Sequence, residues 1–267
     1  MDLHVRAAVT VVRDGLPALV EDDLAIEEPL EVRVDGEPFS VTMRTPGNDL
    51  ELAAGFLVSE GIVAARSELE RLEETGDEGN VVAATIAGPG AVLARQRRRA
   101  LYVSSSCGIC GAASIEAVTT LSAFGVAPPT LRVSAGVLGG LPDRLRAEQR
   151  LFGATGGVHA AGLFGASGSS ITVREDVGRH NAVDKVIGRA FLDDRLPLAD
   201  AVLQVSGRAS FELVQKARMA GIPVLAAVSA PSSLAVQLAE EAGITLVGFS
   251  RAGGFNVYAH PERIDLD

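Results

Sequence analysis

Alternating apolar and polar positions predict β-structure at the start of the chain. Residues 5–12 are rich in β-branched side chains and end at Asp14–Gly15, a pair that is typical of turns. Residues 30–34 and 39–43 alternate on either side of Asp35–Gly36, which predicts a β-hairpin. The sequence thus predicts three strands before residue 45.

Helical spacing first appears after these strands. The segment Thr45–Asp49 suits a turn and a helix cap, and apolar residues then recur at helical spacing up to Gly61, where the helix is expected to end. Residues 69–79 are acidic and are expected to be exposed, whereas residues 81–86 predict a further strand. We interpret residues 1–99 as a small α+β lobe.

Strands and helices alternate through the rest of the chain. The predicted strands are residues 100–104, 170–173, 201–205, 224–228 and 244–247, and the predicted helices are residues 113–124, 181–187, 211–220 and 234–241. This alternation is typical of an α/β fold in which helices cover a mixed, mostly parallel sheet. We therefore expect a larger α/β lobe at residues 100–267, with the lobe boundary near residue 100.

Composition and charge exclude several classes of protein. Of the 267 residues, 47% are hydrophobic and 22% are charged, which is ordinary for a folded chain. The net charge of −10 argues against bulk binding of nucleic acid or of an anionic membrane. The N-terminus lacks the order of a signal peptide, and no apolar run reaches the roughly 18 residues of a membrane span. We expect a soluble, cytoplasmic protein.

The chain has two cysteines, Cys107 and Cys110, within the sequence Ser-Ser-Ser-Cys-Gly-Ile-Cys-Gly. Two cysteines exclude a secreted disulfide framework and a four-cysteine zinc site. The pair lies between a predicted strand and a predicted helix. Helix N-terminal amides stabilise a thiolate, which is the nucleophilic form of the side chain.

The residues alone leave four interpretations of the cysteine pair open. The thiols could be structural, form a thioredoxin-like dithiol, bind zinc with His159 or His180, or carry a persulfide. The dithiol interpretation lacks the Trp expected before such a motif. The zinc-deaminase pattern is incomplete, because the His-x-Glu sequence starts at His260, after the cysteines, and no Pro precedes Cys107.

Three late loops follow predicted strands, and in a parallel sheet they would share the edge where ligands bind. They are residues 206–210, 229–233 and 248–254. The first two precede helices, whose free amides favour phosphate, and Arg208 and Arg251 add guanidinium groups that pair with phosphate oxygens. No dinucleotide-type G-x-G-x-x-G and no P-loop is present, so the use of NAD or ATP is not supported.

Polar residues also gather near two histidines. His159 follows a Gly-rich segment, and His180 lies at a predicted strand–helix junction. Either imidazole could relay a proton beside Cys107 or contact a cofactor, but a structural ion network would explain the second cluster equally well. That cluster comprises Asp176, Arg179, His180, Asn181 and Lys185. The basic run at residues 95–99 fits either a solvated helix face or a contact for an acidic partner.

Five blocks, spread in order over nearly the whole chain, are typical of one family. They are TPGNDLELAAGFLVSEG (45–61), SCGICG (106–111), TGGVHAA (155–161), REDVGRHNAVDK (174–185) and GFSRAGGFNVY (248–258). In these blocks the chain resembles the formate dehydrogenase accessory sulfurtransferase family, FdhD. The block at residues 174–185 is the longest specific match outside the first.

The resemblance implies a function and a set of site residues. Family members accept persulfide sulfur from a cysteine desulfurase and pass it to the molybdenum cofactor, as bis-molybdopterin guanine dinucleotide, for formate dehydrogenase. The persulfide carrier would be Cys107, with Cys110 as an auxiliary thiol. The cofactor, or a guanine nucleotide in the same site, would bind the terminal glycine loop and nearby side chains. These residues are Phe249, Ser250, Arg251, Ala252, Gly253, Gly254, Arg208, His159 and His180.

The resemblance also implies a fold. The larger lobe would be a three-layer structure similar to cytidine deaminase but without the deaminase metal residues, so no zinc is expected. One departure is Ala112, where many relatives have Lys. If that Lys lowers the thiol pKa or contacts the cofactor, another cation substitutes for it here or transfer is slower.

Two other functions stay open. The chain could be a non-catalytic cofactor chaperone or a thiol–disulfide oxidoreductase. Because a bis-nucleotide cofactor has two similar ends and closed dimers are the commonest oligomers, we expect a homodimer.

Overall fold

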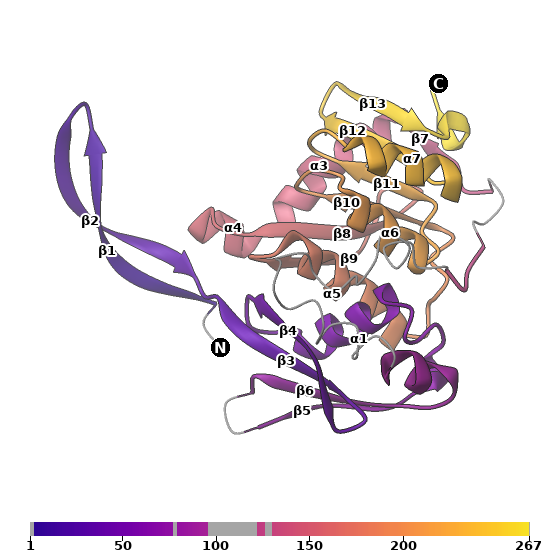
Figure 1. Ribbon diagram of the computed structural model, residues 1–267. Helices are drawn as coiled ribbons and strands as arrows, with labels where there is room; N and C mark the ends of the chain where they lie inside the picture. The colour runs from indigo at the N-terminus through magenta and orange to yellow at the C-terminus, as the bar shows by residue number, and fades with distance from the viewer. Residues whose placement is uncertain (1–2, 77–78, 96–121, 126–129, 267) are drawn as a thin grey trace.

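A six-stranded mixed sheet forms the centre of the larger part of the molecule (Figure 1). The structure, a computed structural model, describes residues 3–76, 79–95, 122–125 and 130–266. The sheet has the strand order β13-β12-β11-β10-β8-β9, in which β10, β11 and β12 are parallel and the other neighbours are antiparallel. The strand bounds are β8 His159–Gly165, β9 Ser170–Asp176, β10 Ala201–Val205, β11 Val224–Ala227, β12 Thr245–Arg251 and β13 Gly254–Ala259.

Helices cover both faces of this sheet (Figure 1). Along β10, Leu203 belongs to the core shared with three helices, whereas its neighbour Val202 belongs to the core shared with α3. Successive strand residues point to opposite faces, so this alternation gives the sheet two apolar faces and the fold three layers. The helices on the first face are α5 Arg179–Leu192, α6 Phe211–Met219 and α7 Ser233–Ala242, and α3 spans Ala135–Glu148.

A second, four-stranded sheet lies in the N-terminal part, with the order β4-β3-β6-β5. Helix α1 (Asp49–Ser59) packs between this sheet and α5. Its residues Leu52 and Ala53 are buried against the sheet, while Leu57 joins the core that α5 shares with the large sheet. The strand bounds are β3 Glu28–Val34, β4 Glu37–Arg44, β5 Leu69–Thr75 and β6 Val81–Ile86.

Two glycines allow α1 and α5 to touch backbone to backbone. A Cβ atom on Gly55 would lie 1.8 Å from the carbonyl oxygen of Asp184, and one on Gly188 would lie 1.8 Å from that of Glu51. No side chain fits at either point, because real Cβ atoms do not approach backbone so closely. The close crossing of α1 and α5 therefore requires glycine at both positions, and this crossing connects the two sheets.

A long hairpin projects from the body of the molecule (Figure 1). It consists of β1 (His4–Arg13) and β2 (Leu16–Ala25). Its root is fixed by a hydrogen bond of 3.0 Å from the amide of Ile26 to the carbonyl oxygen of Leu3, and by contacts of β2 with the short helix α4 (Arg150–Thr155).

The C-terminal residues return to the start of α3. There β14 (Ile264–Asp265) pairs in parallel with β7 (Val133–Ser134). The 3-10 helices η1 (Arg66–Glu68) and η3 (Pro261–Arg263) and a helical segment at residues 89–95 are further described elements.

Most predicted elements are confirmed. Both predicted turns, Asp14–Gly15 and Asp35–Gly36, have positive φ at both residues, as their hairpins require. The predicted strand at residues 100–104, the lobe boundary near residue 100, and the predicted helix at 113–124 lie outside the described residues, except for residues 122–124, which are not helical.

Three expectations differ from the structure. The large sheet is mixed, but it is not mostly parallel, since three of its five described pairings are antiparallel. The acidic segment 69–79 is expected to be exposed, and its described residues other than Leu69 are exposed or half-buried, but the segment also contains β5, a strand that the pattern does not predict. The pattern does not predict α3, because four of its residues are Gly or Pro, which lower helix propensity. Burial of Leu138, Leu141 and Leu145 on α3 compensates for that loss.

Replacing Gly188 by Ala is expected to destabilise the protein by about 3 kcal/mol or more, because the new methyl group overlaps the α1 backbone. Urea unfolding measures the change. Gly140→Ala in α3 is the matched control, because its Cβ meets nothing within 4 Å, and it should leave the protein as stable or slightly more so. Equal stability of the two variants would show that the glycine crossing is not needed.

Candidate functional site

The carboxyl ends of β10, β11 and β12 lie together, as the sequence predicts, and their loops are hydrogen-bonded to one another. The amide of Ser229 donates to the carbonyl oxygen of Gly207 at 3.4 Å, and the amide of Phe249 donates to that of Ser229 at 3.3 Å. A further bond of 3.0 Å joins the amide of Ser232 to the carbonyl oxygen of Ala209. The three loops therefore form one continuous surface at this end of the strands. We call this surface the carboxyl edge.

His159 lies at the same edge, at the start of the antiparallel neighbour β8. It pairs with Asp176 across the β8–β9 ladder. A Cβ atom on Gly207 would lie 3.6 Å from Nδ1 of His159, so the loop after β10 passes directly beside the imidazole. Partial burial and the positive charge of Arg179 lower the pKa of His159, while Asp176 opposes the shift.

His180 lies in the first turn of α5, close to the same loops. Its pKa is lowered to about 4, mainly by burial and then by the positive charges of Arg179 and Lys216. Glu212 opposes this shift, with its Oε2 atom 3.9 Å from Nε2 of His180. Both imidazoles are therefore neutral at neutral pH and can donate one hydrogen bond and accept another.

Two buried nitrogen atoms at this junction have no hydrogen-bond partner among the described residues. They are Nε of Arg179 and Nε2 of His180. Buried polar atoms in folded proteins are nearly always paired, so these two nitrogen atoms are exceptions at this junction. Arg208 is exposed in the loop after β10 and adds a cation to the carboxyl edge.

Phe249 has an unusual backbone at the end of β12. Its φ is +51°, in the left-handed region that bulky residues rarely adopt, and its side chain is 40% exposed. The preceding Gly248 is required by close packing, since a Cβ atom there would lie 2.9 Å from the Tyr258 ring. The chain thus holds an aromatic ring in solvent at the carboxyl edge.

The terminal glycine loop is a β-hairpin turn between β12 and β13, in which Arg251 pairs with Gly254. Arg251, Ala252, Gly253 and Gly254 are all exposed. Ser250 differs from them, because it is fully buried and its hydroxyl donates to the carbonyl oxygen of Leu138 at 3.2 Å. Its side chain is not available to a ligand.

The cluster at the β9–α5 junction is largely structural. Asp176 is completely buried, and its Oδ2 atom lies 2.7 Å from Nζ of Lys185. Lys185 also donates to the carbonyl oxygen of Thr45 at 2.9 Å, and Asn181 donates to Met43 at 2.7 Å and to Asp176 at 3.0 Å. The structural ion network is therefore the interpretation that holds for Asp176, Lys185 and Asn181. Arg179 and His180 are not part of this network.

A second buried ion pair joins three helices and was missed in the sequence. Lys216 of α6 donates to both carboxylate oxygens of Asp184 of α5, at 2.8 and 2.7 Å, and Ser59 of α1 donates to Oδ1 at 2.6 Å. Burial raises the pKa of Asp184, and Lys216 and Ser59 counteract the shift. The sequence signal that could have revealed this pair is a charged residue among the apolar positions of a predicted helix, Asp184 in α5 and Lys216 in α6.

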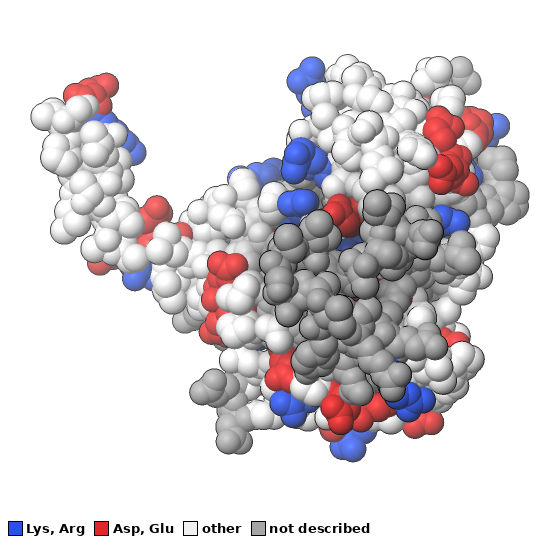
Figure 2. All heavy atoms as spheres, in the orientation of Figure 1, with Lys and Arg blue, Asp and Glu red and all other residues white. Residues whose placement is uncertain are grey.

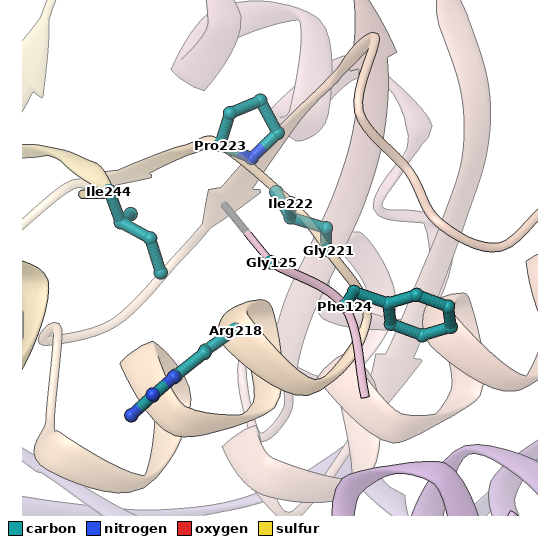
Figure 3. Close-up of a pocket in the computed structure, with 7 residues that line it drawn as sticks. All are labelled: Phe124, Gly125, Arg218, Gly221, Ile222, Pro223 and Ile244. Carbon is teal, nitrogen blue, oxygen red and sulfur yellow. The ribbon is translucent and has the colours of Figure 1, made fainter. Parts of the chain in front are cut away.

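Three hollows lined by described residues lie away from the carboxyl edge. The pocket in Figure 3, between residues 124–125 and the end of α6, has a volume of about 10 Å³, which suits one water molecule. Two larger hollows of about 560 Å³ each are lined by residues of β9, without His159, His180 or Phe249. None of these three hollows includes the loops of the carboxyl edge.

Cys107 and Cys110 lie outside the described residues, so their surroundings are not part of the site geometry. Among the residues that the structure describes, no group of three or more His, Cys, Asp or Glu side chains is placed to hold a metal ion. No helix in the described ranges is long and apolar enough to cross a membrane.

The described residues define a three-layer α/β protein whose carboxyl edge presents two neutral histidines, arginines and an aromatic ring. Residues 25–265 match the profile of the FdhD/NarQ family. The chain belongs to the FdhD/NarQ family.

Relatives are similar along nearly their whole length. The chain is 53% identical to the "Sulfur carrier protein FdhD" of Streptomyces coelicolor, over 98% of this chain and 95% of that protein. It is 44% identical to the protein of the same name from Sulfolobus acidocaldarius, over 98% of each. The fold matches, with a TM-score of 0.77 and 25% identity, a crystal structure from Desulfotalea psychrophila of a protein assigned as a formate dehydrogenase accessory protein, covering 99% of this chain and 100% of that one.

The low pKa of His180 can be measured by NMR as its titration near pH 4. Unfolding restores the ordinary pKa of 6.5, so the unfolded state binds the extra proton between these two values. The free energy of unfolding should therefore fall as the pH drops from about 6.5 to about 4, and His180→Gln should remove that part of the fall. His260, whose pKa is raised, is the internal control in the same titration. If His180 titrated above pH 6, as His260 is expected to do, the result would contradict the burial of His180.

Proposed function

We propose that this protein is a sulfurtransferase that accepts persulfide sulfur on Cys107 from a cysteine desulfurase. It delivers that sulfur to the molybdenum cofactor, as bis-molybdopterin guanine dinucleotide, for use by formate dehydrogenase. The observation that carries the proposal is the sequence similarity to proteins named sulfur carrier protein FdhD, which are 53% and 54% identical to this chain over 98% of its length. The accessory protein with the same fold supports the link to formate dehydrogenase.

The first step is an exchange between sulfur atoms. The Cys107 thiolate attacks the outer sulfur of the donor's persulfide, a new S–S bond forms, and the donor's cysteine leaves as a thiolate. The step needs no external oxidant, because one S–S bond replaces another. It depends on the thiolate form of Cys107, which the expected position before a helix favours.

The second step delivers the outer sulfur to the bound cofactor. The sulfur leaves Cys107 as sulfide when the metal centre supplies two electrons, and Cys107 returns to a thiolate. If Cys110 attacked the persulfide instead, sulfide would be released and a Cys107–Cys110 disulfide would remain, so the sulfur would be lost to the cofactor. Cys110 is therefore assigned an auxiliary role rather than the role of electron donor.

The carboxyl edge supplies the contacts for the nucleotide ends of the cofactor. Helices α6 and α7 begin there, and Arg208 and Arg251 add guanidinium groups that pair with the oxygens of a pyrophosphate. Ser232 already caps the amide of Ala235 in α7, and Glu212 occupies the first turn of α6, so the arginines are the main contacts we propose for phosphate. The exposed ring of Phe249 can stack on guanine. His159 and His180 are neutral, so they can exchange hydrogen bonds with the ligand without adding charge.

Cys107→Ala is expected to abolish sulfur transfer, whereas Cys110→Ala should reduce it less. The measurement is mass spectrometry of the protein after incubation with a cysteine desulfurase and cysteine, in which the Cys107 peptide gains the mass of one sulfur atom. Equal loss in the two variants would favour a dithiol oxidoreductase. Full support of formate dehydrogenase by a Cys107→Ser protein would favour a cofactor chaperone.

Phe249→Ala is expected to weaken the binding of GDP by about tenfold or more, because base–aromatic stacking contributes about 1–3 kcal/mol per base. Isothermal titration calorimetry gives the dissociation constant. Val257→Ala on the neighbouring β13, where the valine is 37% exposed, is the control and should bind GDP normally. An unchanged dissociation constant for the Phe249 variant would show that the guanine base does not stack on Phe249.

A further inference from the structure

Strand β9 forms one edge of the large sheet, and among the described residues it pairs with β8 alone. It is seven residues long. Residues 171–175 are all half-buried, whereas every residue of the central strand β10 is buried. An exposed edge strand of this length is a template on which another extended chain can pair.

The bonding on the other side of β8 shows which backbone groups of β9 point outward. The carbonyl oxygen of Ala160 accepts a bond of 3.0 Å from the amide of Ser206, so the backbone of Ala160 faces β10. Backbone direction alternates along a strand, so Ala160 and Gly162 both face away from β9. Their partners in the β8–β9 ladder are Glu175 and Val173, whose N–H and C=O groups therefore point to the outside of the sheet.

Most of these outward groups are not bonded within the described part of the chain. The carbonyl oxygen of Val173 accepts a bond of 2.8 Å from Nη1 of Arg174. The N–H of Val173 and both backbone groups of Glu175 have no such partner among the described residues. Groups at every second residue of an edge strand are those that an added strand uses for pairing.

Two hollows follow this edge. Each has a volume of about 560 Å³, and the β9 residues that line them are 170–175. Val173 and Arg174 line both hollows, so the two adjoin, and we call them together the β9 groove. At the rise of an extended strand, residues 170–175 span about 20 Å, which is the length of about six residues of an added strand.

The opposite edge of the sheet is less suited to strand addition. There β13 pairs with β12 with two register shifts. Such irregularities twist an edge and hinder further pairing. The pairing of β9 is regular from Thr172 to Asp176.

Most charged side chains around the β9 groove are already engaged inside the protein. Nε of Arg174 lies 2.6 Å from Oε2 of Glu51, and Nε of Arg189 lies 2.9 Å from Oδ2 of Asp193. The carboxylate of Glu175 accepts bonds of 2.9 and 2.8 Å from two amides of α4. These groups shape the groove and need no further partner.

Arg150 and Arg195 line the groove without such a partner. Neither forms an ion pair or a side-chain hydrogen bond with a described residue, and Glu148 is the lining carboxylate in the same situation. The unpaired charge of the groove is therefore positive. The whole chain, in contrast, has a net charge of −10, and carboxylates are spread over the face drawn in Figure 2 from the hairpin tip to the N-terminal sheet.

The two arginines lie on opposite faces of the sheet. Arg150 begins α4, which the side chain of Glu175 contacts, and Val173 on the same side of β9 packs against the core of α3. Arg195 follows α5 on the other face, where its amide donates to the carbonyl oxygen of Ala190 at 2.9 Å. Arg150 lines one hollow and Arg195 the other, so they also lie toward different ends of the groove.

We propose that the β9 groove binds an extended, acidic segment of a partner protein as an additional strand of the large sheet. The backbone of the segment pairs with the outward groups of Val173 and Glu175. A carboxylate toward each end of the segment, on opposite faces, pairs with Arg150 and Arg195. The proposal concerns the β9 groove alone and does not depend on the proposed sulfur transfer.

The probe is a fluorescently labelled peptide of sequence ETVTVTVE, whose glutamates lie at opposite ends and on opposite faces when it is extended. KTVTVTVK is the matched peptide of reversed charge. Fluorescence anisotropy with the full-length protein should give a dissociation constant about tenfold lower or more for the acidic peptide. Absence of binding by the acidic peptide, or equal binding of both peptides, would overturn the proposal.

A charge-reversed protein tests the two arginines. Arg150→Glu/Arg195→Glu should reverse the preference, so that KTVTVTVK binds more tightly than ETVTVTVE. Arg13→Glu/Arg71→Glu is the control, because it changes the net charge equally at exposed positions outside the groove, and it should keep the natural preference. The same change of preference in both variants would show that net charge, and not the groove, selects the peptide.

Strand addition also has a signature that a contact between charges lacks. Two forms of ETVTVTVE carry N-methyl groups on the valines or on the threonines, and therefore on one edge of the extended peptide or on the other. One form should lose binding and the other should bind like the unmodified peptide. Equal affinity of the two forms would contradict pairing as a strand.

Hydrogen exchange measured by NMR gives the matching observation on the protein. Binding of the acidic peptide should slow exchange at the outward amides of Val173 and Glu175. The amides of Thr172 and Arg174, which face β8, are the internal control and should not change. Unchanged exchange at Val173 and Glu175 in the bound protein would overturn the assignment of β9 as the docking edge.

Discussion

The contact between the backbones of α1 and α5 is the constraint on which the rest of the structure depends. Gly55 and Gly188 let the helices approach until no side chain separates them. Two buried ion pairs lie beside this crossing, Lys185 with Asp176 and Lys216 with Asp184. Each is anchored to the N-terminal part, the first through Thr45 and the second through Ser59. The charges are tolerated in the interior because every one has a close partner.

This arrangement also determines where the candidate site residues lie. The Asp176 carboxylate accepts bonds from the amides of Gly178 and Thr45, which fixes the bend from β9 into α5. The bend places Arg179 and His180 at the carboxyl edge, next to the loop that carries Arg208. Lys216 neutralises Asp184 in the core and also helps to keep His180 uncharged. The interior ion pairs therefore influence the protonation state of a residue at the surface.

Local patterns in the sequence predicted most of the strands and helices, because alternation and turn residues such as Asp14–Gly15 report local geometry directly. They did not predict α3, whose four Gly and Pro residues conceal a buried leucine face, or the strand β8. They also could not give the direction of β9, which depends on pairing between distant segments. The shared edge of β10, β11 and β12 was predictable, since parallel strands end on the same side. The division of the 174–185 block into interior ion pairs and surface residues was not, because Asp176 and Lys185 look the same in sequence whether they face a ligand or each other.

The backbone of Phe249 has a consequence for how this position can vary. A glycine there would adopt the left-handed conformation without strain and would favour folding, but it would offer no ring at the carboxyl edge. Any other large side chain would keep the strain without the same flat surface. Under the proposed function, selection for thermal stability and selection for ligand affinity therefore act in opposite directions at this one residue.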